Sequence, residues 1–570
     1  MASIQCRTSR GKKYWSIVES RRINGKPRTV ILEYLGTALT LLDRLQGNES
    51  FSLKSYSHSD TSALLNVAKE LGVIDTINKH IPARKNGTKP LRDDLTVGAS
   101  FLLAAIGRAC QPTSKMGWYD WCKTTSLEYA TNRSFKKLDS QHFWDQMNTL
   151  PIESISLIEE ELVKKLITTY QIELDCLFFD TTNFFTFIDS ANTHCDLPQR
   201  GKNKQKRYDL RQIGMALLVS RKEQFPLFHK TYRGNKNDIT VFQETFNALS
   251  ERLRKISDEL SDVTIIFDKG NNSKDNFNML DRQGCYYVAG LVSSYFKPLI
   301  EEANKNFQTM EIDGEKQPVY RIKKEIWGTE RTCVITVSTL LKEGQIRGIH
   351  QHLEKKYKLL QEFKQQLENT KKRKSFSEKE ITEKLKDIIR GQFIDEFLKF
   401  DIIKLSNDEP SFTYYIDIEA YRNLQENVLG RKIVVTNRHD WTEEEILLAY
   451  RGQAKVEYAF RTMKNPHHLA IRPQYHWTDQ KIEAHFLICI IGYLLAIAVY
   501  TKAKTAGYSR NIHHLMEELN QIRLGCVTKK KSNKIKFQLE TAPHHFKKIL
   551  EALDISDNTI KQKINFSDYR

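Results

Sequence analysis

The sequence predicts an α/β protein with a mixed β-sheet, preceded by a β-hairpin and a helical region. Strand-like and helix-like patterns alternate over residues 174–291. Residues 60–165 instead carry apolar side chains at three- and four-residue spacing, which predicts helices. An Asn-Gly pair within residues 13–35 predicts the tight turn of the hairpin.

Length and charge restrict the class of protein. The chain has 570 residues, 40% of them hydrophobic, so we expect several globular domains rather than a disordered chain. Lys and Arg number 88 against 70 for Asp and Glu, which gives a net charge of +18. This surplus favours a polyanionic partner, and nucleic acid is the first expectation. A basic protein without such a partner is the alternative.

Three features argue against other classes. The cysteines form no CxxC pair and no Cys/His array with metal-ligand spacing, so a zinc finger is not expected. The N-terminus lacks an apolar run, so we expect no signal peptide. The segment "AHFLICIIGYLLAIAVY" at 484–500 falls short of a membrane span, and a buried helix is the better interpretation.

The first 168 residues are expected to form two regions. Residues 1–50 are interpreted as a β-rich segment, because "KYWSIVESRRINGKPRTVILEYL" at 13–35 alternates around the turn. Residues 51–168 are interpreted as a helical domain that docks DNA ends or a second subunit.

The sheet is expected to start with three consecutive strands and to continue as β-α-β. The three strands are predicted at 174–180, 212–220 and 225–234, and a long helix follows with Asp238 as its N-cap. A fourth strand at 263–268, a helix and a fifth strand at 285–291 come next.

Residues 301–428 break this order and predict a largely β insertion. Strand candidates surround a charged helical stretch there, whose apolar positions keep helical spacing. The strand pattern resumes at 430–437. One amphipathic helix over 443–464 follows, with Thr442 and Glu445 spaced as a capping box.

Three carboxylates stand where elements end or turn. Asp180 and Asp268 are expected to end the first and fourth strands of the sheet, at an edge where ligand groups gather in α/β proteins. Glu457 reaches them from the helix at 443–464. Clustered carboxylates repel unless cations hold them, and hard oxygen ligands suit Mg²⁺ or Mn²⁺. Two such ions would support displacement at a phosphodiester.

A plainer interpretation stands beside this one. An isolated Asp at a strand end is often a loop cap, and an isolated Glu on a helix often belongs to a solvated face. Asp180 lies between aromatic residues in "FFDTTNFFTF", and Asp268 precedes the Gly/Asn turn "KGNNS". On pattern alone both interpretations stay open.

The helix at 443–464 lines up Tyr450, Glu457 and Lys464 every seven residues. At ~100° per residue a seven-residue step returns to the same face of a helix. Here the sequence "YRGQAKVEYAFRTMK" resembles the Tyr-x2-Arg-x3-Glu-x6-Lys signature of a group of bacterial insertion-sequence DDE transposases, with Gln453 in the place of the Arg. The resemblance extends through "FFDTTNFFTF", "IIFDKGNNS" and "LAIRPQYHWTDQKIEAHFLICIIGYLLA".

The resemblance implies a ribonuclease-H-like catalytic core at 169–300 and 429–510, interrupted by the insertion at 301–428 and followed by a basic C-terminal region at 511–570. Asp180, Asp268 and Glu457 would be the catalytic residues, and they would also bind two Mg²⁺ or Mn²⁺ ions. The long separation between the last two fits an inserted domain.

The resemblance also implies DNA contacts around Glu457. Tyr450 and Lys464 would touch the phosphates that flank the scissile bond. Gln453 stands where the signature has a DNA-contacting Arg, and it is counted here among the DNA contacts. Arg461, one turn beyond Glu457, is expected on the same helix face as Glu457 and is also counted. In the alternative interpretation neither residue contacts DNA: Tyr450 packs the helix and Lys464 caps its C-terminus.

A basic segment lies between the first two strands of the sheet. "RGKNKQKRYDLR" at 200–211 has six Lys or Arg in twelve residues, among them Lys204, Lys206 and Arg207. We expect these to contact DNA phosphates near the site, and a solvated loop is the equal alternative.

The expected function is that of a DNA transposase that cuts the terminal inverted repeats of an insertion sequence and joins the 3′-hydroxyl ends to target DNA. Its partners would be double-stranded DNA and a second copy of the chain, without a membrane, in the bacterial cytoplasm at the nucleoid. Two alternatives remain. One is a transposase-derived DNA-binding repressor or architectural protein, and the other is a nuclease without strand transfer.

Overall fold

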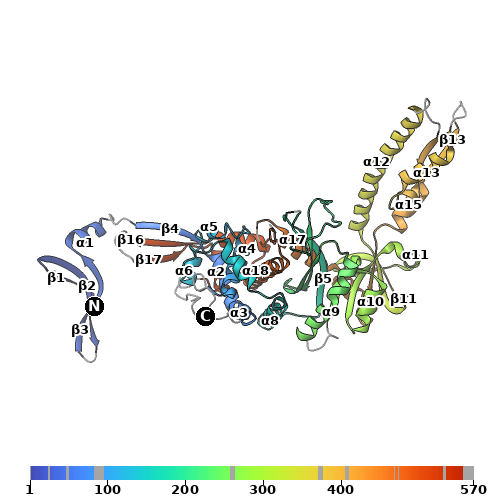
Figure 1. Ribbon diagram of the computed structural model, residues 1–570. Helices are drawn as coiled ribbons and strands as arrows, with labels where there is room; N and C mark the ends of the chain where they lie inside the picture. Colours follow the sequence, from blue (N-terminus) through green and yellow to red (C-terminus); the bar gives the residue numbers. More distant parts are fainter. Residues whose placement is uncertain are drawn as a thin grey trace. The chain divides into compact units, whose positions relative to one another are not determined.

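The computed structural model describes residues 2–23, 26–46, 51–82, 95–189, 191–256, 263–369, 376–404, 410–467, 469–472, 474–529 and 535–555. The chain divides into two compact units, whose elements are labelled in Figure 1. The first comprises Met1–Leu150, Pro466–Ala470 and Ile491–Arg570, and the second comprises Pro151–Asn465 and Ile471–Ile490. Each unit is described by itself.

The second unit contains a nine-stranded sheet with the order β10-β11-β12-β15-β9-β8-β5-β6-β7. β5, β8 and β9 pair in parallel and the other neighbours are antiparallel, so the predicted mixed α/β fold is confirmed. The strands are β5 (Cys176–Phe185), β6 (Gln212–Ser220), β7 (Pro226–Arg233), β8 (Thr264–Phe267), β9 (Tyr286–Leu291), β10 (Gln308–Ile312), β11 (Glu315–Ile326), β12 (Thr329–Val337) and β15 (Arg431–Thr436).

Helices pack against this sheet and bury its central strands. Every residue of β6 is buried, which requires cover on both faces and explains its nearly continuous apolar sequence. Among these helices α8 packs on β7, α16 on β9 and α17 on β5. The helices are α8 (Ile152–Tyr170), α9 (Asp238–Ile256), α10 (Lys274–Arg282), α11 (Lys297–Asn306), α16 (Glu443–Arg451) and α17 (Ala454–Lys464).

Two predicted helix starts are tested by the hydrogen bonds at their first turns. At α16 the Thr442–Glu445 capping box is confirmed. At α9 the Thr240 amide donates to the side chain of Asn237 at 2.9 Å, so Asn237 is the cap and the prediction of Asp238 was wrong by one residue. Both side chains are of a type that accepts such a bond, so the sequence did not separate them.

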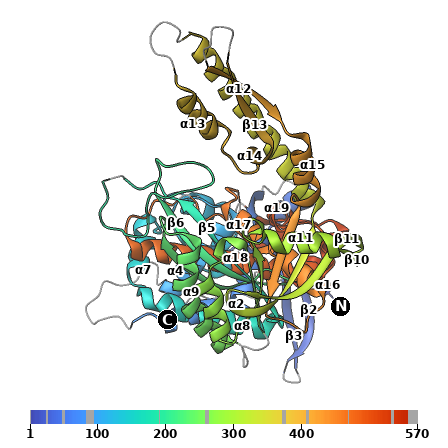
Figure 2. The ribbon, with the colours of Figure 1, turned by 90° about the vertical axis from the view of Figure 1, so that its right-hand side faces the viewer.

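The expected largely β insertion is wrong in composition. β10, β11 and β12 are strands, but they extend the large sheet through the pairing of β12 with β15. The chain that follows contains more helix than strand and has its own apolar core, with Leu360 and Phe363 among its buried residues. α12 lies beside α13 and β13 (Figure 2). These elements are α12 (Thr339–Asn369), α13 (Glu378–Ile389), α14 (Ile394–Phe397), β13 (Leu398–Lys404), β14 (Pro410–Ile416) and α15 (Ile418–Asn427).

The first unit starts with a three-stranded antiparallel sheet. The predicted hairpin corresponds to β2 and β3, and its turn at 24–25 lies outside the described residues. A further strand, β1, was not predicted. The elements are β1 (Ala2–Ser9), β2 (Lys12–Ile23), β3 (Lys26–Gly36) and α1 (Ala38–Leu45).

The rest of the first unit is mostly helical, as the periodicity of 60–165 predicted, although α8 belongs to the second unit. A small sheet joins β4 to the C-terminal strands β16 and β17. The elements are β4 (Phe51–Ser57), α2 (Ser59–Glu70), α3 (Val73–Lys79), α4 (Val97–Cys110), α5 (Trp118–Cys122), α6 (Leu127–Thr131), α7 (Ser140–Asn148), α19 (Ile512–Gln521), β16 (Arg523–Lys529), β17 (Ile535–Leu539) and α20 (Lys547–Ala552).

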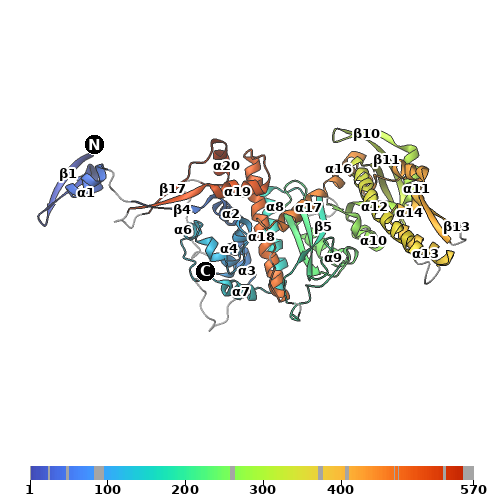
Figure 3. The same cartoon turned by 90° about the horizontal axis from the view of Figure 1, so that it is seen from above.

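The apolar segment at 484–500 forms part of α18 (Asp479–Thr505), drawn in orange in Figure 3. Among the helices of the described residues, only α18 is long and apolar enough to cross a membrane. In its most apolar window, 94% of the residues are buried within the protein.

Candidate active site

Asp180 and Asp268 each follow one member of the last residue pair between two neighbouring parallel strands. Phe179 of β5 is paired with Phe267 of β8, Asp180 is the next residue of β5, and Asp268, with an extended backbone, directly follows the end of β8. Residues in register on parallel neighbours point to the same face of a sheet, so the two carboxylates converge. Both are half-buried.

One of the two aspartates does not end its strand as predicted. Asp180 does not end its strand, because β5 continues to Phe185 while pairing with β6. The strand that ends is β8, at Phe267. Beyond this point the side of β5 that faced β8 has no strand partner among the described residues, and this opening is where the carboxylates stand.

Asp268 is held from two sides. The Tyr450 hydroxyl donates to its Oδ1 at 3.2 Å. After Asp268 the chain turns, and the side-chain amide of Asn272 donates to the Gly290 carbonyl of β9 at 2.6 Å, which fixes this turn to the sheet. Burial raises the pKa of the Tyr450 phenol, and the charges of Asp268 and Glu457 raise it further. The phenol therefore keeps its proton for this hydrogen bond.

Tyr450 can approach Asp268 because residue 290 is a glycine. A Cβ atom at Gly290 would lie 2.2 Å from the Tyr450 hydroxyl oxygen, far inside contact distance. This requirement is not visible in the sequence, since Gly290 falls within an ordinary apolar strand pattern.

The single helix predicted at 443–464 is two helices. α16 ends at Arg451 and α17 starts at Ala454, and the Gln453 and Lys455 amides bond three residues back, as in a tightened turn. A Cβ at Gly452 would lie 2.3 Å from the Phe178 ring, so the turn packs directly on β5. The prediction of one helix was therefore wrong: Tyr450 lies on α16, whereas Glu457 and Lys464 lie seven residues apart on α17.

The three signature residues occupy different environments. Tyr450 bonds to Asp268, whereas Glu457 is exposed on α17. Lys464, at the end of α17, donates to the Thr182 hydroxyl of β5 and lies over the Phe184 ring at 5.2 Å. Tyr450 and Lys464 thus reach the carboxylate edge from two helices, at Asp268 and beside Asp180 respectively.

The Lys464 ammonium group has an unusual electrostatic environment. Burial lowers its pKa to about 8, and the positive charges of Arg472 and Lys204 act in the same direction. The negative charge of Asp180 opposes them. Several cations therefore surround the two carboxylates, and an anionic group that binds here would relieve their repulsion. Arg472 was not predicted as a site residue, although it lies in the quoted segment "LAIRPQYHW".

Gln453 is placed where it anchors the helix. It is 8% exposed, and its side chain donates to the Phe179 carbonyl of β5 at 3.2 Å. This bond ties the turn between α16 and α17 to the strand that carries Asp180. The predicted DNA contact for Gln453 disagrees with this buried position.

The other predicted DNA-binding residues are exposed. Lys204, Lys206 and Arg207 lie in the loop between β5 and β6, and the Arg207 guanidinium group pairs with Asp209 at 2.7 Å. Arg461 lies on α17 over the Tyr458 ring at 5.0 Å. Of the three loop residues, Lys204 acts electrostatically on Lys464, which places it near the carboxylate edge.

The carboxylates fit a divalent cation in part. Asp180 and Asp268 offer two hard oxygen ligands on one open edge, as Mg²⁺ or Mn²⁺ requires. Across the described residues, however, no three His, Cys, Asp or Glu side chains are grouped to hold an ion. The triad of Asp180, Asp268 and Glu457 stays a prediction, and the charge of Glu457 acts on Tyr450, the residue that bonds to Asp268.

Comparison with known proteins decides the family. A family model described as "Transposase DDE domain" matches residues 185–495, more than half of the chain. The chain belongs to this family. The matched segment of the DDE domain includes Asp268 and Glu457, and it begins five residues after Asp180. The assignment of Asp180 to the site therefore rests on the pairing of β5 with β8, directly before the two aspartates.

Other comparisons add little for this transposase-family chain. No curated protein matches it. A cryo-EM structure of the piggyBac transposase synaptic complex with hairpin DNA is similar at a TM-score of 0.38 and 9% identity, over 80% of this chain and 79% of that chain.

Proposed function

We propose that this member of the DDE family is an active DNA transposase that cuts at the terminal inverted repeats of its element and joins the 3′-hydroxyl ends to target DNA. The observation that carries the proposal is the in-register pair Asp180 and Asp268, with Tyr450 and Lys464 beside it, in a chain of this family. The sheet order β7-β6-β5-β8-β9 supports the finer proposal of a ribonuclease-H-like core.

Each residue has a proposed part in positioning the DNA. Lys464, beside Asp180, offers a point charge to a phosphate near the scissile bond. Tyr450 orients the Asp268 carboxylate through its hydroxyl group. Lys204, Lys206, Arg207 and Arg461 are exposed cations that would hold the flanking backbone.

Asp180 and Asp268 would hold Mg²⁺ or Mn²⁺, and such ions, when bound, activate the attacking oxygen and stabilise the leaving oxygen. Glu457 is the proposed third ligand. Its exposed side chain on α17 leaves it room to change rotamer. Two ions, a homodimer that pairs two element ends and a place at the bacterial nucleoid belong to the same proposal.

The test compares cleavage with binding. DNA that carries the inverted repeats flanking the gene is expected to be cut by the wild-type protein in Mg²⁺ and to yield joined products with a target. Asp180→Asn and Asp268→Asn are expected to abolish cleavage, and both should still bind this DNA in EDTA. Products that are cut but never joined would favour a nuclease.

A non-cleaving DNA-binding protein is the second candidate, and one observation favours it. Within the described part of the chain, no three acidic, His or Cys side chains are grouped to hold an ion. That candidate requires specific binding to the repeats without Mg²⁺-dependent cleavage. Glu457→Gln separates the two: it should reduce cleavage by orders of magnitude if Glu457 joins the site with DNA bound, and it should leave binding unchanged in either case.

A further inference from the structure

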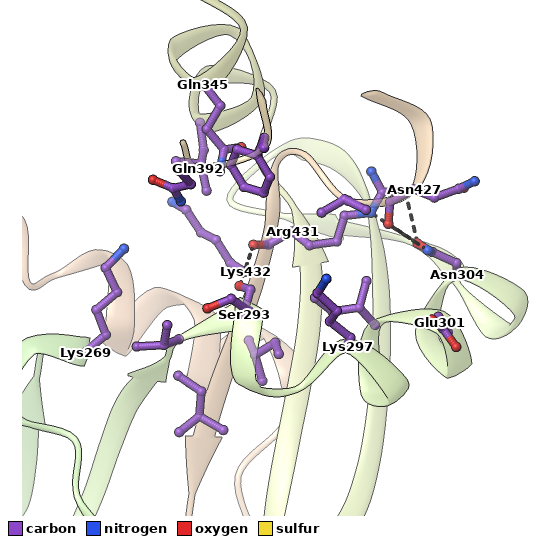
Figure 4. A pocket seen from close by; sticks show the side chains of 18 of the residues that line it. Lys269, Ser293, Lys297, Glu301, Asn304, Gln345, Gln392, Asn427, Arg431 and Lys432 are labelled. Atoms are coloured by element: carbon purple, nitrogen blue, oxygen red, sulfur yellow. Dashed lines mark hydrogen bonds between the residues drawn. The ribbon is translucent and has the colours of Figure 1, made fainter. Parts of the chain in front are cut away.

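A cleft of about 1220 Å³ opens beside Asp268. Asp268, Lys269 and Tyr450 line its inner end, next to the carboxylate edge. Its walls come from β9 and β15 of the sheet, from α11, and from the helical elements that follow β12. Figure 4 shows the side chains that line it, including Lys269, Lys432 and Arg431. The cleft lies wholly within the second unit.

The inner end of the cleft is positively charged. Lys269 follows Asp268 directly, and Lys432 lies on β15 and is half-buried. Neither ammonium group has an ion pair or hydrogen bond with another described residue. Burial lowers the pKa of the Lys432 ammonium group, the charges of Arg451 and Lys269 act in the same direction, and Asp268 opposes them. Both lysines line the cleft and neither is in an ion pair within the described part of the chain, so this end of the cleft would attract an anionic ligand.

Apart from Asp268, the acidic residues of the cleft lie on other elements. Glu301 is on α11, and Asp395 and Glu396 are on α14. Lys297 lies within 3.9 Å of Glu396, so part of this acidic charge is paired. The remaining wall carries neutral polar side chains that can donate to phosphate oxygens, among them Ser294, Gln392 and Asn423.

We propose that this cleft binds the sugar-phosphate backbone of one unpaired DNA strand where the strand leaves the carboxylate pair, with Lys269 and Lys432 as its phosphate contacts. The proposal deepens the proposed function and rests on it for the identity of the strand as DNA. It adds two cations, Lys269 and Lys432, on the Asp268 side of the site. Lys464 of the signature lies on the other side, near Asp180.

The size of the cleft favours a single strand over a duplex. Pockets of about 300–1,000 Å³ bury most of one drug-sized ligand. A cleft slightly larger than this has room for a short stretch of single strand but not for a double helix. Proteins that bind single strands without sequence preference use such positively charged grooves to follow the backbone.

The test measures binding of a labelled single strand of about 12 nucleotides, within the usual site size of such grooves. Binding is followed in EDTA by fluorescence anisotropy between about 50 and 200 mM salt. Lys269→Gln and Lys432→Gln are each expected to lower the slope of log K against log salt by about 0.7, the loss of one phosphate contact to a single strand. Lys432→Arg keeps the charge and is expected to keep the slope.

Lys379→Gln is the matched control, because Lys379 is exposed on α13 and does not line the cleft. Thermal melts of all variants exclude unfolding as the cause. An unchanged slope in the Lys269→Gln/Lys432→Gln double variant overturns the proposal, as does an equal loss in Lys379→Gln. If the lysine variants have a lower slope but the wild-type protein never cuts DNA, the cleft is supported and the proposed function is overturned. If the slope is unchanged but the wild-type protein cuts DNA, the proposed function is supported and the cleft is overturned.

Discussion

Lys464 is the residue whose chemistry the fold changes most clearly. An exposed lysine stays charged well above neutral pH, but burial lowers the pKa of Lys464 to about 8, with Arg472 and Lys204 acting in the same direction. Its charge is therefore present at pH 7 and is lost as the pH rises through about 8. One unit above its pKa, about a tenth of the residue carries charge.

This shift predicts a pH-dependent DNA affinity. In EDTA at pH 7, wild-type protein should bind a DNA duplex more tightly than Lys464→Gln, because the ammonium group contacts phosphate. At pH 9 the difference in affinity between the two proteins should shrink several-fold, because Lys464 has lost most of its charge. Other titrating groups are common to both proteins and do not affect the difference. Fluorescence titrations at the two pH values measure it, and a constant difference would show that Lys464 contributes no titrating charge to binding.

Gly290 supports Asp268 indirectly, through Tyr450. In Gly290→Ala the new methyl group would overlap the Tyr450 hydroxyl, and such overpacking costs about 1–3 kcal/mol. Displacement of Tyr450 would also break its bond to Asp268. We expect a lower free energy of unfolding in urea and slower cleavage.

Gly344→Ala is the control for Gly290→Ala. Gly344 lies in α12, and a Cβ there meets nothing within 4 Å. Alanine is favoured over glycine in a helix by about 1 kcal/mol, so this variant should be as stable as wild type or slightly more stable. A loss of stability equal to that of Gly290→Ala would rule out the steric explanation.

The residue scale also shows what sequence spacing cannot give. Tyr450 and Lys464 were identified from their spacing, and both reach the carboxylate edge. Gln453 was grouped with them because it occupies the place of a DNA-contacting Arg, yet it is buried. The tightened turn at Gly452 determines which side chains between α16 and α17 face β5. The prediction of one regular helix did not include that turn.

At the scale of elements, a buried charge network joins α8, β7 and α9. The Glu159 carboxylate lies 2.5 Å from His229 Nδ1 and accepts from Arg252 at 2.8 Å. Burial alone would raise the pKa of Glu159, but His229 and Arg252 outweigh it and lower the pKa. For His229 burial alone would lower the pKa, and the attraction of Glu159 raises it.

Glu159→Gln is expected to destabilise the sheet side of the second unit. It leaves the Arg252 guanidinium group, which is 3% exposed, without its counter-charge. Removing one partner of a buried pair typically costs about 3–5 kcal/mol. Urea unfolding measures this loss.

The neighbouring Glu160 provides the control. It pairs with Lys164 and Lys255, whose side chains are about half exposed. Such surface pairs contribute about 0–1 kcal/mol, so Glu160→Gln should stay close to wild type. Equal losses in the two variants would show that burial of the network at Glu159 is not the cause.

Elements differ in how well the sequence predicted them. β5 to β9 and their helices followed from continuous apolar runs between polar turns, because these strands are buried by packed helices. The insertion was misjudged for a different reason. Strand candidates were recognised within 301–428, but local pattern does not tell which sheet a strand joins, and β11 and β12 extend the large sheet beside β15.

At the scale of the whole molecule, the site draws on segments that are far apart in the chain. Asp180 and Asp268 could be placed near each other from the sequence because each follows an apolar strand pattern, although β5 continues beyond Asp180. Glu457 could not be placed in the same way, because its position depends on the rotation of α17 after the break at Gly452. The cleft of Lys269 and Lys432 was also beyond the sequence, since its walls come from the sheet and from the elements that follow β12.

The net charge of +18 predicts how DNA affinity depends on salt. Each phosphate neutralised on a duplex contributes about −0.9 to the slope of log K against log salt. A protein with 6–10 phosphate contacts loses about 10³–10⁵ in affinity between 50 and 200 mM salt. We expect losses of this order for both random duplex DNA and the inverted repeats in EDTA. The ratio of the two affinities should change far less, because base contacts release no counterions. An affinity for random DNA that hardly changes with salt would mean that the basic surface does not bind the backbone.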